Sequence, residues 1–219
     1  MSDIFQEVDE EVRRERLEKL WKQYGNYIIA ALVVVLACIG AWRAYIYWEE
    51  RKASEAGAAY EAATTLADQG KHAEAQAAFA KLASEGTAGY RTLSRFREAA
   101  QLGLSDAKAA VAAYDALVAD GSLGRTLQDL AAVRAGLLLV DTASYQELRT
   151  RLEPLTAADR PFRHSARELL AFGAWRAGDN AAANQWVNAV YSDPETPGGI
   201  RNRIDMLAAL LPPAPDGKG

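Results

Sequence analysis

The pattern of hydrophobic and polar positions divides the chain into three parts. Residues 1–24 are rich in charge, with a thin apolar stripe at helical spacing, and predict a solvated amphipathic helix. The next part, 25–48, is almost entirely apolar. From 49 to 211, small and apolar residues recur at spacings of three and four, which predicts a series of helices. The pattern therefore indicates an all-α chain.

The apolar segment 25–48 has the length and the edges of a transmembrane helix. Its 18 uncharged residues from Gly25 to Trp42 reach roughly 27 Å as a helix, close to the hydrocarbon thickness of a bilayer. Aromatic residues cluster at both ends, as they do where a spanning helix meets the headgroups. A core helix of a soluble protein is the alternative, but neither face of the segment is polar. The aromatic residues are Trp21, Tyr24, Tyr27, Trp42, Tyr45, Tyr47 and Trp48.

A cleaved lipoprotein signal is a second alternative for this segment. Val35, Leu36 and Ala37 before Cys38 loosely match a lipoprotein cleavage box. However, the preceding region is long and rich in acids, unlike a short basic signal region, and the chain stays apolar after Cys38. The sequence therefore favours an uncleaved anchor.

Basic residues near the ends of this segment predict its orientation. Five precede it, and three lie at or beyond its C-terminal end. Because cytoplasmic flanks carry the excess of Lys and Arg, we expect the N-terminus in the cytoplasm and the larger C-terminal part in the periplasm of a bacterium. The residues are Arg13, Arg14, Arg16, Lys19 and Lys22 before the segment, and Arg43, Arg51 and Lys52 after it.

The C-terminal part contains an internal repeat. Four segments place apolar residues four and seven positions after a first small or apolar residue, and these first residues are 35, 38 and 35 positions apart. Because the three positions share one helical face, each set predicts the buried side of a helix. The third set departs from the others because it begins with leucine rather than alanine. The sets are Ala75, Phe79 and Leu82; Ala110, Tyr114 and Leu117; Leu148, Leu152 and Leu155; and Ala183, Val187 and Val190.

Each of these helices is preceded by another, approximately at 54–68, 88–103, 126–140 and 162–177. Two antiparallel helices in about 35 residues is the plan of the tetratricopeptide repeat (TPR). We therefore expect a charged cytoplasmic helix at 1–24, a transmembrane helix at 25–48, and a TPR-like α-solenoid of about four helix pairs at 49–197. A capping helix at 198–211 and a disordered tail at 212–219 complete the prediction.

With this architecture and the N-terminal run MSDIFQEVDEEVRRERLEKLWKQYGNYI, the chain resembles the ancillary SecYEG translocon subunit family. The TPR domain of that family is similar to the one in cell-division coordinator proteins. The resemblance implies an inner-membrane protein with periplasmic repeats, which sits beside the translocon and passes emerging chains to chaperones. The resemblance does not rest on any catalytic motif.

Composition narrows the function further. Residues 53–219 hold 20 acidic and 17 basic side chains, so no basic field is available for nucleic acid. Cys38 is the only cysteine, and His72 and His164, both expected on solvated surfaces, are the only histidines. No phosphate loop, metalloprotease motif or nucleophile elbow is present. We therefore predict no catalytic, cofactor or metal site, no small-molecule substrate, and a protein that is not an enzyme.

Protein binding remains, because the first helices of a TPR stack line an extended groove. If Phe172 and Trp175 are not core residues, which helical spacing also permits, they belong to this groove with six others. The leading hypothesis is a membrane-tethered adaptor of the Sec translocon and periplasmic chaperones. The alternative is a structural scaffold for cell-envelope or division complexes. The predicted groove residues are Tyr60, Thr64, Arg95, Ala99, Val133, Leu137, Phe172 and Trp175.

Overall fold

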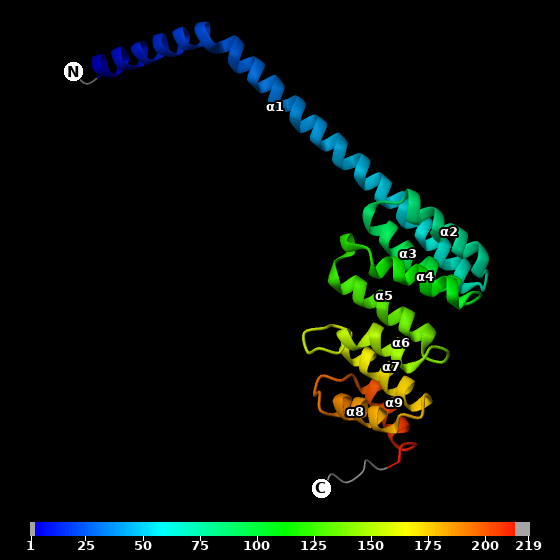
Figure 1. Ribbon diagram of the computed structural model, residues 1–219. Helices are drawn as coiled ribbons and strands as arrows, with labels where there is room; N and C mark the ends of the chain where they lie inside the picture. The colour runs from blue at the N-terminus through cyan, green and yellow to red at the C-terminus, as the bar shows by residue number, and fades with distance from the viewer. Residues whose placement is uncertain (1–2, 213–219) are drawn as a thin grey trace. The chain divides into compact units, whose positions relative to one another are not determined.

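The computed structural model describes residues 3–212, with side chains from residue 13 onward. All regular elements of this part are helices, which confirms the predicted all-helical class (Figure 1). The predicted tail, apart from Pro212, lies outside the described residues. The helices are α1 (Asp3–Asp68), α2 (His72–Glu85), α3 (Ala88–Leu102), α4 (Ala107–Val118), η1 (Gly121–Leu123), α5 (Gly124–Leu139), α6 (Tyr145–Leu152), η2 (Glu153–Leu155), α7 (Arg163–Arg176), α8 (Asn180–Tyr191) and α9 (Gly198–Ala208).

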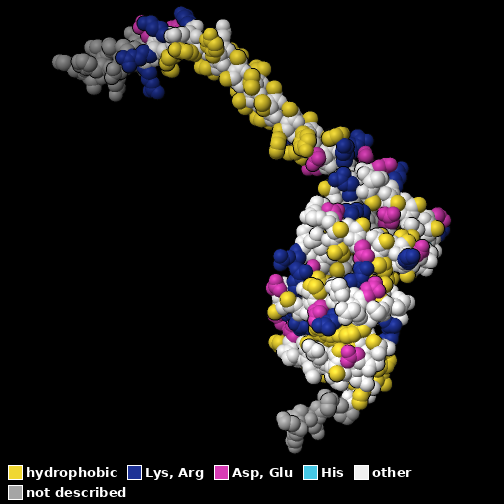
Figure 2. Space-filling view, in the orientation of Figure 1, with side chains coloured by type: hydrophobic (Ala, Val, Ile, Leu, Met, Phe, Trp, Pro, Cys, Tyr) yellow, Lys and Arg dark blue, Asp and Glu magenta, His cyan; other side chains and the backbone are white. Residues whose placement is uncertain are grey.

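The chain forms two compact units, Met1–Glu55 and Ala56–Gly219. The first unit consists of the N-terminal part of α1, whose apolar segment presents hydrophobic side chains on its surface (Figure 2). This helix is long and apolar enough to cross a membrane, and the protein buries none of its most apolar window. After the apolar run, Lys52 Nζ lies 3.4 Å from the centre of the Trp48 ring. An aromatic ring beside a basic residue is typical of a helix end at a membrane interface.

The second unit is a row of antiparallel helix pairs, each packed against its neighbours in sequence (Figure 1). The first and last pairs turn at glycines with positive φ, Gly70 at 75° and Gly178 at 76°. This conformation is easy only for glycine and ends the first helix of each pair. Asp106 and Asp179 then cap the second helices α4 and α8, each carboxylate accepting a backbone N–H bond of 2.9 Å.

The repeat positions define the core of this unit. All twelve residues of the predicted sets are buried, from Ala75 in α2 to Val190 in α8. Nine of them belong to hydrophobic clusters that also include buried alanines on the first helices, such as Ala99 and Ala135. Small side chains on both sides of a contact bring the helix axes close together. The alanine-rich composition is therefore used for close packing within and between the pairs.

The third pair replaces the small residue by leucine and accommodates it with glycine. A Cβ atom on Gly173 of α7 would lie 2.6 Å from Leu148 Cδ1, and a Cβ on Gly136 of α5 would lie 3.0 Å from Leu152 Cδ1. Both leucines of α6 are fully buried. A larger residue at position 148 is thus offset by the absence of a side chain at Gly173 on the neighbouring helix, and the close packing of the helices is preserved.

The last helix, α9, covers the end of the row. Its Ile200, Ile204 and Leu207 are buried in the same core as α7 and α8. On its other side, Arg203 Nη2 donates to Glu168 of α7 at 2.9 Å, and its Nε donates to the other carboxylate oxygen at 2.5 Å. A two-point guanidinium–carboxylate pair fixes geometry as well as distance. The helix is therefore held to α7 by both apolar and charged contacts.

A charged cluster joins α7 to the turn after α8. Asp193 accepts hydrogen bonds of 2.8 Å from Arg163 Nε and from Arg167 Nη1. These guanidinium groups, chiefly Arg163, hold the pKa of Asp193 well below its ordinary value. His164, predicted on a solvated surface, is instead buried, with Nδ1 at 3.2 Å from the Thr196 hydroxyl. The predicted solvated position of His164 is therefore wrong. Burial also lowers the pKa of the His164 imidazole.

Candidate protein-binding surface

The first helices carry an exposed stripe that repeats along the row. On α3 and the turn after it, the spacings of four, three and four residues align Leu93, Arg97, Ala100 and Leu104, and all four are exposed. The same spacings on α5 and the turn after it align Leu130, Arg134, Leu137 and Asp141, each 37 positions further along the chain. On α7 the corresponding face carries Phe172 and Trp175. We call these ten residues the first-helix stripe.

Exposed apolar side chains are concentrated on this stripe. Between residues 56 and 197, the exposed large hydrophobic side chains are Leu93, Leu104, Leu137, Trp175 and Tyr191, with 50%, 63%, 53%, 39% and 38% of their surface accessible. The first four are stripe positions, and Tyr191 lies at the end of α8. Single exposed leucines are ordinary on a protein surface. Here Leu137 and Trp175 occupy equivalent positions of α5 and α7, and Leu93 and Leu104 lie on the same face of α3 and the turn after it, which makes the stripe a candidate interaction surface.

Two arginines lie between these apolar residues. Arg97 and Arg134 are both exposed, and within the described part of the chain neither has a carboxylate oxygen within 4.0 Å. Arg97 is partly held in place, because its Nε donates to the Tyr60 hydroxyl at 3.0 Å. The stripe therefore combines aliphatic side chains with two positive charges that the described protein does not neutralise.

The predicted groove residues divide between this stripe and other environments. Leu137, Phe172 and Trp175 belong to the stripe, and Phe172 is half-buried because it also packs on the core. Val133 lies one turn before Leu137 and is half-buried against the same core. Thr64 is half-buried on α1, where its hydroxyl donates to the Tyr60 carbonyl at 3.0 Å.

Three predicted groove residues serve the interior instead. Tyr60 is half-buried, and its ring centre lies 5.4 Å from that of Phe79 and 5.8 Å from that of Tyr90. Arg95 pairs with Asp120 at 2.6 Å, at the turn after α4. Ala99 is fully buried in the core. Neither Arg95 nor Ala99 lies on the first-helix stripe, which runs through Arg97 and Ala100 of α3.

The ion pair of Arg95 has a clear electrostatic role. Hydrogen bonds from the Ser122 hydroxyl, at 2.6 Å, and from Arg95 lower the pKa of Asp120 to about 2. Both interactions favour the ionised carboxylate. Asp120 thereby joins α3 to the turn between α4 and α5, which makes Arg95 a structural residue of the repeat junction.

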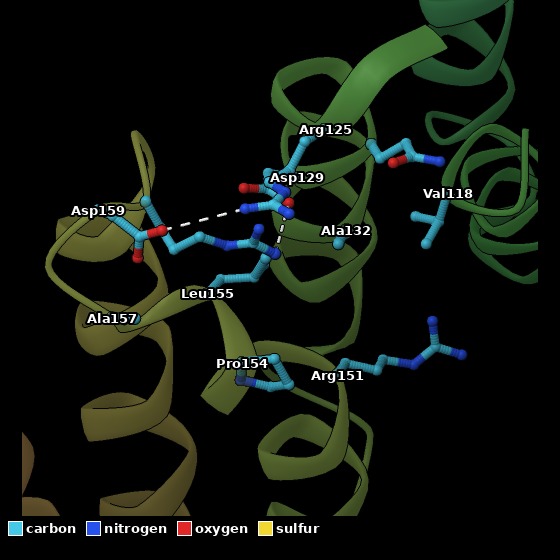
Figure 3. Close-up of a pocket in the computed structure, with 11 residues that line it drawn as sticks. Val118, Arg125, Asp129, Ala132, Arg151, Pro154, Leu155, Ala157 and Asp159 are labelled. Carbon is cyan, nitrogen blue, oxygen red and sulfur yellow. Dashed lines mark ion pairs between the residues drawn. The ribbon is translucent and has the colours of Figure 1, made fainter. Parts of the chain in front are cut away.

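A polar cavity of about 610 Å³ lies beside α5. Figure 3 marks two ion pairs in its lining, at Asp159 and at Asp129. Arg125 pairs with Asp159 at 4.0 Å, and the Arg160 guanidinium pairs with Asp129 at 3.0 Å. Asp129 is buried, and this burial raises its pKa above the ordinary value. The two pairs attach the turn after η2 to α5, and the third lining arginine, Arg151, pairs with Asp115 of α4 outside the lining. No sequence motif pointed to this cluster, since its residues are 30 and more positions apart.

The described residues contain no group of three or more His, Cys, Asp or Glu side chains placed to hold a metal ion.

The comparison with protein families agrees with a binding fold. A model of the tetratricopeptide repeat-like domain family matches residues 18–184, most of the chain. The protein belongs to this family, whose repeats form a non-catalytic fold for protein interaction. Searches of curated proteins and of solved structures found no match.

Proposed function

We propose that this protein is a membrane-tethered adaptor that presents the first-helix stripe to partner proteins. The observation that carries the proposal is the stripe itself, where Leu93, Leu104, Leu137 and Trp175 stay exposed on one face of the first helices and the turn after α3. A folded domain gains free energy by burying such side chains, so their exposure favours a surface that is covered on binding. TPR-like domains in general bind other proteins.

The tether in this proposal is the segment 25–48, inserted in the bacterial inner membrane. Its support is the unburied apolar surface of α1 together with aromatic residues at both edges. The five-to-three bias of basic residues favours a cytoplasmic N-terminus and a periplasmic repeat domain. In that position the adaptor serves the Sec translocon and periplasmic chaperones, as the family resemblance implies.

A second candidate function is a scaffold for cell-envelope or division complexes. A scaffold needs two separate surfaces, and a second exposed apolar site exists near the end of the row. Met206 and Leu210 are 64% and 63% exposed and lie one helical turn apart on and just beyond α9. The adaptor needs only the first-helix stripe, whereas the scaffold needs both surfaces at once.

Site-specific photocrosslinking in native membranes tests the proposal. A photoreactive phenylalanine analogue replaces Leu137 in the full-length protein, and a matched variant carries it at Ala112, an exposed position on the second helix α4. We expect Leu137 adducts with translocon subunits or chaperones, and none of these adducts from Ala112. Division or wall-synthesis proteins captured at both Leu137 and Met206 would favour the scaffold. Equal adducts from Ala112 and Leu137 would place the interface elsewhere.

A further inference from the structure

We infer that the partner segment bound by the first-helix stripe carries carboxylates between aliphatic side chains. This inference rests on the proposed function and specifies the chemistry of its partner. The stripe places an arginine between apolar positions in two successive repeats, Leu93–Arg97–Ala100 and Leu130–Arg134–Leu137. A complementary segment places aliphatic side chains against the apolar positions of the stripe and a carboxylate against each arginine.

The argument for carboxylates begins with the state of the two arginines. Most other arginines of the repeat unit already have acceptors within the protein, as Arg151 has in Asp115 and Arg176 in the Val140 carbonyl at 2.9 Å. Arg97 and Arg134 have no carboxylate partner among the described residues. A partner that covered them with apolar groups alone would remove water from two charges without compensation. A carboxylate supplies the missing acceptor and discriminates against basic segments.

The spacing of the stripe supports one partner that contacts both repeats. Leu138 of α5 reaches α3, since a Cβ on Gly103 would lie 3.4 Å from Leu138 Cδ2. The two helices that carry Arg97 and Arg134 are therefore neighbours in the row. Leu93 and Leu137 lie on opposite sides of the arginine positions along the helices, so aliphatic contacts flank the charged centre.

Charge also indicates where along the row the carboxylates bind. The corresponding face of α1 carries Glu61, which is exposed and unpaired in the described structure, in place of arginine. At the other end, α7 carries Phe172 and Trp175. The acidic part of the partner therefore belongs over α3 and α5, and an apolar or aromatic part belongs over α7.

Peptide binding to the full-length protein in lipid nanodiscs tests this inference. The probe is a fluorescently labelled amphipathic peptide of leucine, alanine and glutamate, and two matched probes carry glutamine or lysine in place of glutamate. Anisotropy titrations should rank the peptides glutamate, glutamine, lysine from tightest to weakest. Two exposed ion pairs contribute a factor of about two to three each, so we expect a roughly four- to tenfold preference for glutamate over glutamine.

Paired variants separate the charge from the apolar contribution. In R97Q/R134Q, binding of the glutamate peptide should fall to that of the glutamine peptide, while the glutamine peptide binds as before. The control R91Q/K108Q removes the same charge from two exposed positions off the stripe and should keep the preference. In L93A/L137A, all peptides should bind more weakly.

The outcomes distinguish this inference from the function on which it rests. Equal binding of all three peptides, or a preference that survives R97Q/R134Q, overturns the acidic partner and leaves the adaptor intact. No binding of any peptide also overturns it, and the photocrosslinks at Leu137 then decide whether the stripe binds proteins at all. Self-association of the protein that L137A abolishes would assign the stripe to a second copy of this chain and likewise overturn it.

Discussion

At the scale of single residues, arginine–carboxylate pairs join helices to distant helices and turns of the repeat unit. Arg95 with Asp120, Arg151 with Asp115, and Arg163 with Asp193 each join a helix to an element 25 or more positions away. Exposed ion pairs contribute little to stability, but a pair that is largely shielded by protein also fixes the position of a turn.

Substitution of Asp193 should reveal this difference. Asp193→Asn leaves Arg163 and Arg167 without their shared carboxylate. Glu195→Gln removes a second partner of Arg163, but the Glu195 side chain is 75% exposed. We expect Asp193→Asn to lower the thermal midpoint several times more than Glu195→Gln does. Differential scanning calorimetry of the purified protein measures both. Equal midpoints would mean that solvent already screens the Asp193 cluster.

The acid stability of the protein should depend on Ser122. The pKa of Asp120 falls from 3.8 to about 2 in the folded state, so its ionised form stabilises the fold above pH 3.8, and this contribution disappears as the pH falls toward 2. Ser122→Ala removes the largest cause of the shift and should flatten the pH dependence in that window. Urea unfolding at a series of pH values measures it. Ser105→Ala, which removes a hydroxyl bonded only to a backbone carbonyl, is the control and should keep the original slope.

At the scale of helices, the sequence predicted more than it did for single side chains. The recurrence of Ala75, Ala110 and Ala183 identified buried positions because close helix packing demands small residues at one point of each pair. The glycine that accommodates Leu148, Gly173, was not foreseen, because the two residues lie on different helices. Helical spacing relates residues within one helix, and it carries no information about which residues of the adjacent helix pack against them.

This packing predicts a specific coupling between Leu148 and Gly173. Gly173→Ala places a Cβ against Leu148 and should cost about 1–3 kcal/mol, as overpacking does. Leu148→Ala alone should cost about 2–5 kcal/mol through the cavity it leaves. The double variant should be more stable than the sum of the two costs predicts, because the new methyl group enters the vacated space.

Chemical denaturation of the four proteins in this cycle measures the coupling. Gly89→Ala on α3 is the control, since a Cβ there has no atom within 4 Å, and a helix gains about 0.4–1 kcal/mol from that exchange. Additive costs for Gly173→Ala and Leu148→Ala would show that the two residues do not share one space.

At the scale of the whole molecule, the sequence located the first-helix stripe only in part. Leu137, Phe172 and Trp175 lie on the stripe, and their role in binding stays a prediction, based on aromatic and aliphatic side chains as interface anchors. Arg95 was placed in the groove by helical register alone, whereas the structure places Asp120 beside it. Which arginine is free depends on a contact between residues 25 positions apart, and such contacts leave no local signal in a single sequence.

The final prediction concerns the topology of the full-length chain. We expect residues 1–24 in the cytoplasm and the repeat unit in the periplasm, because five basic residues precede the apolar segment and three lie at or beyond its C-terminal end. Cys38 is the only cysteine, so a Cys38→Ala background permits labelling at single chosen sites. Ser84→Cys reports on the repeat unit and Glu15→Cys on the N-terminal helix, and both positions are exposed. A membrane-impermeant maleimide added to spheroplasts should label Ser84→Cys at once and Glu15→Cys only after lysis. The reverse pattern would place the repeats in the cytoplasm, and immediate labelling of both sites would mean that the segment does not separate them. The first result excludes a periplasmic adaptor, and the second excludes a membrane-spanning anchor. Both leave the first-helix stripe available to partners in the compartment where the repeats are found.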